Sequence, residues 1–227
     1  MDKYQQRKQR GWVETSELLA YKDKSLSELK AMLTAEDARE RTIAVQLLPL
    51  YCELTNILLN SLANESALYT RLAIMEKLEH GDQATAQKMI PFLASIGNNQ
   101  HHSPTSPSKK KSFPLPRDLI ARSLGRMNPK IFSILLESAQ QRLPLSQLSE
   151  LIDAIGYMAF YHPEVATTEN FHRLLEIQKR YRDKPLIQWK LLICFSAFPQ
   201  SVDHLLQEKQ FVSEAQRSLK LLAAKKD

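Results

Sequence analysis

The sequence predicts an all-α protein made of successive helical hairpins. Apolar residues recur at helical spacing along most of the 227 residues, only five glycines are present, and prolines or capping residues interrupt the pattern repeatedly. The expected helix pairs begin roughly thirty to fifty residues apart, a range typical of helical-hairpin repeats. We therefore expect a right-handed α-solenoid of about four or five antiparallel helix pairs, without a sheet, forming a single domain over residues 1–227.

The clearest hairpin lies at residues 116–136. A first helix would place one stripe on the core: Leu119, Ile120, Ser123, Leu124 and Met127. Asp118 and Arg122 are four residues apart and can pair on another side of that helix. Asn128 can cap a second helix, with Pro129 at its first position, where the missing amide proton costs nothing.

Residues 1–33 are expected to cap the array. They are rich in charge, and Trp12 belongs to a first helix with few other large apolar groups. Ser25 and Glu28 have the spacing of a capping box, which predicts a short second helix through Met32. Terminal helices of this kind shield a face that the next repeat would otherwise cover.

The following segment predicts two hairpins. Thr34 and Asp37 repeat the capping-box spacing before a helix at 38–48, which Pro49 ends, and a partner helix follows at 53–62. A third helix is expected at 64–80. After a turn at Gly81, a fourth is expected at 83–96, with a kink near Pro91.

Residues 97–115 are predicted to be an inserted basic, polar loop. The stretch 97–112 contains almost no apolar residue and is rich in Ser, Pro, Asn and Lys. Such a composition cannot bury enough apolar surface to offset the entropy of ordering, so we expect an exposed, mobile segment between two intact repeats. Loops of this length inside compact domains are more often functional or disordered than structural.

The C-terminal part continues the helical pattern. Helices are expected from Pro144 through Met158, from Pro163 to about Tyr181, from Lys184 to Phe198, near 202–206 and at 211–224. Residues 199–227 are predicted to form the C-terminal capping helices.

The segment Arg117-x-x-x-Ala121-x-x-Leu124-Gly125 resembles the first-helix signature of HEAT repeats, particularly the short HEAT-like repeats of the phycobilisome-lyase type. Three other segments are similar more loosely: 41–44, 71–74 and 153–156. The resemblance covers approximately residues 34–200, with the loop as an insertion. It implies a HEAT-like scaffold whose second helices line a concave binding face.

No arrangement of residues predicts catalysis, a cofactor or a metal site. His101 and His102 are adjacent, but no Cys, Asp or Glu lies between Gly97 and Arg117 to complete a ligand set. No nucleophile motif or glycine-rich phosphate loop is present. Cys52 and Cys194 are expected to be buried free thiols, as in a reducing compartment. We therefore expect a protein that is not an enzyme.

The protein is expected to be soluble and cytoplasmic. Its first ten residues are polar and do not resemble a secretory signal. The longest apolar stretch, Leu186 to Phe198, is interrupted by Gln188 and Lys190 and is too short to span a bilayer.

The basic residues are the best candidates for partner binding. The net charge is +6, and seven cations fall in a short span opposed only by Asp118. Together with one residue of a later second helix, the candidates are Lys109, Lys110, Lys111, Arg117, Arg122, Arg126, Lys130 and Arg173. Because the expected second helices carry mixed polar side chains, a protein or peptide, including an acidic one, fits them better than a duplex. We predict a scaffold that binds such a partner on its concave face.

The alternative is a nucleic-acid-binding protein related to the alkylpurine DNA glycosylases of HEAT-like fold, which are similar in length and charge. Those enzymes place tryptophans close to a catalytic Asp. Here Trp12 and Trp189 are expected to be isolated from any such group, which argues against this interpretation. A bilin lyase is less favoured still, since repeat similarity alone supports it.

Overall fold

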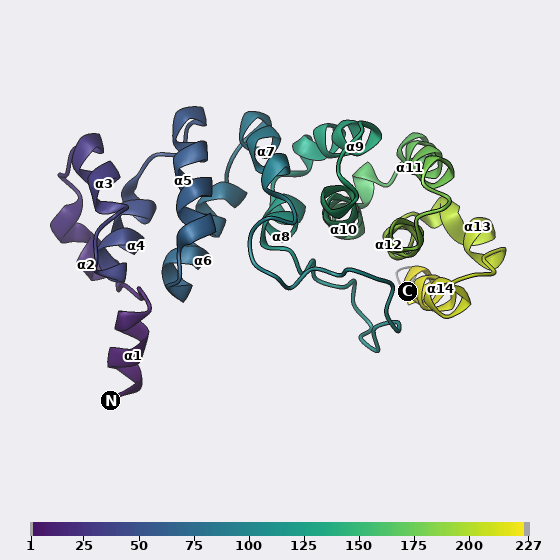
Figure 1. Cartoon of the computed structure of the whole chain (residues 1–227), viewed down its shortest axis with the longest axis horizontal. Coiled ribbons are helices and arrows are strands. Elements are labelled where there is room, and N and C mark those ends of the chain that lie inside the picture. The colour runs from purple at the N-terminus through teal and green to yellow at the C-terminus, as the bar shows by residue number, and fades with distance from the viewer. Residues whose placement is uncertain (1, 225–227) are drawn as a thin grey trace. The chain divides into compact units, whose positions relative to one another are not determined.

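A computed structural model describes residues 2–224, except for the side chain of Cys52 (Figure 1). Every regular element in this range is a helix, and no strand is present among the described residues. The all-α class is therefore confirmed. The described part forms two compact units, which divide between Lys88 and Met89. A single solenoid domain over the whole chain stays a prediction.

The first unit contains short helices followed by three longer ones. Its elements are α1 (Lys3–Gln9), α2 (Thr15–Leu18), η1 (Leu19–Tyr21), α3 (Leu26–Met32), α4 (Ala38–Leu47), α5 (Cys52–Asn64), α6 (Leu68–Glu79) and most of α7 (Gln83–Met89). Helix α6 packs against both α4 and α5, and α3 packs on α4. Leucines at four positions of α5 are fully buried, so this helix supplies much of the core.

Several helix starts are those that the sequence predicts. Ser25 and Glu28 form both hydrogen bonds of a capping box at α3. Helix α4 begins at the expected residue, but Asp37 caps it alone, through a hydrogen bond from Arg39 N. Arg41, in the same helix, forms a two-pronged ion pair with Glu65 at 2.8 Å and ties α4 to the end of α5.

The predicted first helix around Trp12 is wrong. The chain leaves α1 at Gly11, whose φ of +86° belongs to the left-handed region. A Cβ at this position would lie 2.6 Å from Thr70 Oγ1 of α6, so a glycine is also required by the packing. The break buries part of the segment after α1 against the unit instead of extending the helix.

The second unit begins with η2 (Ile90–Phe92) and continues through seven α-helices. These are α8 (Leu119–Arg126), α9 (Phe132–Gln140), α10 (Leu145–Tyr161), α11 (Thr168–Arg180), α12 (Pro185–Phe195), α13 (Val202–Leu206) and α14 (Val212–Ala224), with the single turns η3 (Pro129–Ile131), η4 (Pro163–Val165) and η5 (Pro199–Ser201). The expected helix at 83–96 ends at Met89, and the expected helix from Pro163 starts only at Thr168. The C-terminal capping helices are predicted over residues 199–227, and the last three residues of that range lie outside the described part.

These helices form two layers. Helices α8, α10, α12 and α14 pack one against the next, while α9 and α11 pack on each other and lie above α10 and α12 in Figure 1, in the teal to yellow part of the chain. The first helix of each hairpin therefore lies in one layer and the second in the other. This is the neighbour pattern expected of stacked hairpins.

Helix α8 follows its predicted stripe with one difference at its start. Ile120, Ser123 and Leu124 are buried, and Asn128 caps η3 through Lys130 N as expected. Asp118, however, is fully buried: it caps α8 through Ala121 N and accepts further hydrogen bonds from Ala94 N and Gln100 Nε2. Asp118, which was expected to pair with Arg122, is thus a buried cap that joins α8 to the beginning of the loop.

The 97–115 loop contains no helix or strand, and it packs on the second unit through a few of its residues. Phe113 is only 4% exposed and contacts the rings of Tyr157 and Phe160 in α10. His101 stacks edge-on against Trp189 of α12. Most of residues 97–112 are exposed, as expected, and a few side chains at both ends of the loop bind to the first-helix layer, while the mobility of the segment stays a prediction.

We predict that Gly156→Ala destabilises the second unit by about 1–3 kcal/mol, the usual cost of overpacking a core. An added Cβ would lie 2.8 Å from Phe113 Cζ and 2.9 Å from Cys194 Cα, and the latter is backbone that cannot turn away. Chemical denaturation measures the change.

Gly125→Ala is the matched control. Its Cβ would meet the side chain of Tyr157 at 3.1 Å, which can shift, so the cost should be clearly smaller. Equal stability losses in the two variants would contradict the packing argument.

Candidate functional site

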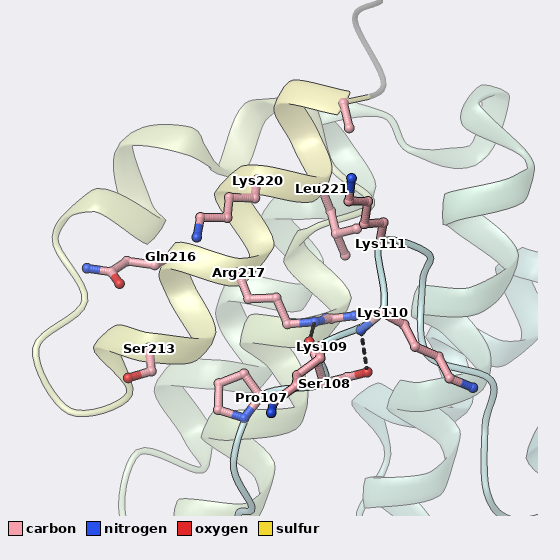
Figure 2. Close-up of a pocket in the computed structure, with 11 residues that line it drawn as sticks. Pro107, Ser108, Lys109, Lys110, Lys111, Ser213, Gln216, Arg217, Lys220 and Leu221 are labelled. Carbon is pink, nitrogen blue, oxygen red and sulfur yellow. Dashed lines mark hydrogen bonds between the residues drawn. The ribbon is translucent and has the colours of Figure 1, made fainter.

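A cationic pocket lies between the loop and α14 (Figure 2). Its volume is about 560 Å³. The residues that line it are Pro107, Ser108, Lys109, Lys110, Lys111, Ser213, Gln216, Arg217, Lys220, Leu221 and Ala224. The α14 members are spaced three or four residues apart, so helical periodicity brings them to one face.

Arg217 fixes the loop against this face. Its Nε donates to Ser108 O at 2.9 Å and its Nη2 donates to Ser112 O at 3.1 Å, and Figure 2 shows it extending from α14 toward the loop backbone. These two carbonyls immediately precede and follow Lys109–Lys111. Since Nη1 faces Glu214 Oε1 at 3.4 Å, the guanidinium is committed on three sides. Arg217 therefore positions the three lysines without being free to bind a ligand itself.

The pocket is strongly positive. Five of its eleven described lining residues are Lys or Arg, and none of the eleven is acidic. The three loop lysines are exposed. Their ammonium groups are therefore hydrated point charges that do not belong to buried ion pairs. Leu221, Ala224 and Pro107 add an apolar surface beneath them. This arrangement suits an anionic group attached to an apolar body.

A second cavity, of about 350 Å³, adjoins the cationic pocket; we call it the Trp189 cavity. Its lining residues are His101, Thr105, Ser106, Ser108, Lys110, Pro114, Leu115, Arg117, Asp153, Trp189, Ile193, Glu214 and Arg217. The loop forms one wall, and α10, α12 and α14 form the other. Both sites thus border the first-helix layer, whereas the sequence predicted binding by the basic end of the loop together with the second helices.

Buried charges lie at the base of the Trp189 cavity. The side chain of Lys190 has no exposed surface; its Nζ binds Asp153 Oδ2 and lies 3.5 Å from Glu150 Oε1. Burial raises the pKa of Glu150 to about 7, against the opposing effect of Lys190. Burial also raises the pKa of Asp153, again opposed by Lys190. Two carboxylates therefore share one ammonium in a poorly hydrated place.

Trp189 links the cavity to the cationic pocket. Its Nε1 donates to Glu214 Oε2 at 3.1 Å, and Glu214 in turn faces Arg217. The His101 ring lies 5.0 Å from the Trp189 ring, nearly perpendicular to it. Burial, helped by the charges of Lys190 and Arg117, lowers the pKa of His101 to about 4, so this histidine is neutral at physiological pH.

The structure brings together only part of the predicted site. Lys109, Lys110 and Lys111 share the cationic pocket, and Lys110 and Arg117 line the Trp189 cavity. The remaining four candidates line neither space: Arg122, Arg126, Lys130 and Arg173. Arg122 Nε donates to Pro116 O, and Arg173 Nε donates to Gln140 Oε1, so both hold the fold together.

Sequence reasoning missed the residues that organise both spaces. Arg217 and Lys220 complete the cationic pocket, but they are far from the loop in sequence. Trp189 is not isolated from carboxylates as expected, since Asp153 lines the same cavity and Glu214 accepts its hydrogen bond. One signal was available: Lys190 interrupts an otherwise apolar helix, and a charge in such a position requires a buried partner.

No protein-family model, curated protein or solved structure matches the chain. Within the described residues, no helix has the length and apolar character needed to cross a membrane. The same residues contain no group of three or more His, Cys, Asp or Glu side chains arranged to hold a metal ion. Cys194 is a buried free cysteine, and burial raises the pKa of its thiol. The predicted buried thiol at Cys52 lies outside the described side chains.

We predict that Arg217→Gln accelerates tryptic cleavage after Lys109–Lys111 at least about tenfold, because hydrogen bonds from charged groups contribute roughly 1.5–3 kcal/mol each. The variant frees both carbonyls that Arg217 holds, and the loop then opens more often. Mass spectrometry of early digests identifies the cleavage sites. Arg182→Gln, an exposed residue of the same unit, is the control, and an unchanged rate in Arg217→Gln would contradict the clamp.

We predict that Glu150→Gln changes the pH dependence of stability. Between pH 4.5 and about 7 the folded state holds the Glu150 proton that the unfolded state releases, so the free energy of unfolding falls as pH rises through this window. Glu150→Gln lacks this decline. Its free energy of unfolding, relative to that of the wild type, therefore rises across the window, by up to roughly 1.4 kcal/mol for each unit by which the folded pKa of Glu150 exceeds the unfolded one. His101 acts in the opposite direction but is common to both proteins. Denaturant titrations at the two ends of the window measure the difference, and a constant difference would contradict it.

Proposed function

We propose that this chain is a non-enzymatic binding protein that holds an acidic segment of a protein partner in the cationic pocket. The observation that carries the proposal is the charge of that pocket: Lys109, Lys110, Lys111 and Lys220 line it with Arg217, and no acidic side chain is among its described lining residues. A protein rarely gathers like charges in a concave place unless a counter-charge binds there, because their mutual repulsion is destabilising.

The pocket's composition supports a peptide as the ligand. Exposed charge pairs contribute only about 0–1 kcal/mol each, so several lysines must act together and apolar contacts must supply the remainder. Leu221 and Pro107 offer such contacts within the same pocket. Ser213 and Gln216 add neutral hydrogen-bonding groups for a peptide backbone.

We further propose that the helices belong to a right-handed, HEAT-like α-solenoid that acts as a scaffold in the cytoplasm. The layered packing of α8, α10, α12 and α14 supports this, since each first helix contacts the next one. On this proposal the long loop crosses the first-helix layer and adds a binding site to it, while the second helices keep their polar side chains for other contacts.

Nucleic-acid binding related to the alkylpurine DNA glycosylases is the second candidate. The observation in its favour is that Trp189 and Asp153 line one cavity. Two observations favour the peptide. The Asp153 carboxylate is held by Lys190, and Arg122 and Arg173 bind their own chain, so they do not extend the cationic pocket into a strip for a phosphate backbone.

We predict that the protein binds a fluorescein-labelled octaglutamate peptide, and that the triple variant Lys109→Ser, Lys110→Ser, Lys111→Ser lowers the affinity at least about tenfold at low ionic strength. Fluorescence anisotropy measures both affinities. The matched control removes three exposed cations elsewhere in the same unit, at Lys179, Arg182 and Lys209, and should leave binding nearly unchanged.

Binding of random-sequence duplex DNA that carries the same fluorescein label distinguishes the peptide-binding proposal from the nucleic-acid one. Tighter binding of the duplex than of the peptide, with a steep dependence on salt, would replace the peptide proposal by the nucleic-acid one. Equal loss of peptide binding in both triple variants would reduce the interaction to general attraction by net charge.

A further inference from the structure

The Trp189 cavity and the cationic pocket are neighbours that a single ligand can reach. Ser108, Lys110 and Arg217 line both. A peptide held by the loop lysines therefore passes the mouth of the Trp189 cavity. The inference rests on the proposed function: once an acidic segment binds at the lysines, its partner protein also presents a side chain to this cavity.

The walls of the Trp189 cavity suit a flat apolar group. Trp189, Ile193, Pro114 and Leu115 contribute indole, aliphatic and proline surface. A volume of about 350 Å³ exceeds a single aliphatic side chain and accommodates an aromatic ring with part of its backbone. Pockets of this kind receive the aromatic anchors that dominate the binding energy of many interfaces.

A hydrogen-bond acceptor lies at the base of the same cavity. Asp153 is 12% exposed, and Lys190 binds its Oδ2. Within the described chain its Oδ1 accepts no hydrogen bond, so a donor that enters the cavity can bind there without displacing Lys190. Such a donor would also add a second interaction to a carboxylate that is held in poorly hydrated surroundings.

The charges at the rim exclude a cationic anchor. Lys110 and Arg117 are exposed and line the cavity, and Lys190 lies behind Asp153. A Lys or Arg side chain from a partner would meet four positive charges, those of Arg217 included, against the two carboxylates of Asp153 and Glu214. Carboxylates next to the anchor, in contrast, would face Lys110 and Arg117.

We propose that the Trp189 cavity receives a tyrosine side chain of the acidic partner segment, with its ring against Trp189 and Ile193 and its hydroxyl donating to Asp153 Oδ1. Tyrosine combines an aromatic body with a neutral donor at its tip. Phenylalanine fills the same space but leaves the buried acceptor unpaired. The recognised motif is thus a tyrosine flanked by Asp or Glu.

The test is a positional scan of the octaglutamate peptide, in which each Glu in turn is replaced by Tyr, Phe or Ala. At one or two positions the Tyr peptide should bind about tenfold more tightly than the Phe peptide, since a site built for a hydroxyl donor rejects the analogue that lacks it. Trp12→Phe leaves Trp189 as the single tryptophan, and its fluorescence should change on binding of the Tyr peptide but not of octaglutamate.

Two variants locate the effect. Asp153→Ala should abolish the preference for Tyr over Phe; Lys190 keeps Glu150 as a partner, and circular dichroism checks the fold. Leu115→Trp fills the cavity from an exposed loop position, 43% accessible, where no loss of folding is expected. This variant should bind the Tyr peptide about tenfold more weakly and should bind octaglutamate with unchanged affinity.

The outcomes separate the two proposals. Octaglutamate binding without any gain from Tyr, or a Tyr preference that persists in Asp153→Ala, overturns the tyrosine site while the proposed function stands. Failure of every peptide to bind overturns both. Tighter binding of Phe than of Tyr would show an apolar cavity in which Asp153 takes no part, and would likewise overturn the inference.

Discussion

The second unit depends on one buried ammonium group. Lys190 has no exposed side-chain surface, and in a medium of low polarity an unpaired charge costs many kcal/mol. Asp153 and Glu150, three residues apart on α10, satisfy it from one direction. The pair of carboxylates therefore dictates the distance and rotation between α10 and α12, and it fixes Asp153 at the base of the Trp189 cavity. Apolar side chains alone would hold the two helices together but would permit other registers.

The position of Lys190 determines what its neighbour does. Successive helical residues point about 100° apart, so Trp189 leaves α12 toward α14, where it donates to Glu214. Glu214 orients Arg217, and Arg217 holds the backbone on both sides of Lys109–Lys111. A series of hydrogen bonds and an ion pair thus leads from Trp189, the neighbour of the buried Lys190, to the backbone on both sides of three exposed lysines. The cationic pocket and the Trp189 cavity both border this series of contacts, since Arg217 lines both.

Local signals predicted the helices well and the site poorly. The capping box at Ser25 and Glu28 and the cap at Asn128 depend on neighbours in sequence, so the sequence reveals them. A glycine is required at position 11, just after α1, because Thr70 of a distant helix occupies the space of a Cβ there, which no local pattern contains. Arg217 could not be linked to the loop for the same reason, since more than a hundred residues separate it from Ser108. The loop's composition correctly predicted an exposed segment without helix or strand, but it could not reveal the few side chains that anchor the loop.

The loop is held by few contacts relative to its length. Ordering its backbone costs about 1–2 kcal/mol per residue, and the gains come mainly from Phe113, His101 and the two carbonyls that Arg217 binds. Such a segment belongs to the least stable part of a folded unit and opens before the helices do. The cationic pocket exists only while the loop is closed on α14, because both contribute to its lining. Any ligand that contacts both must therefore stabilise the closed loop, and a substitution that loosens the loop weakens ligand binding in proportion to the fraction of closed protein that is lost.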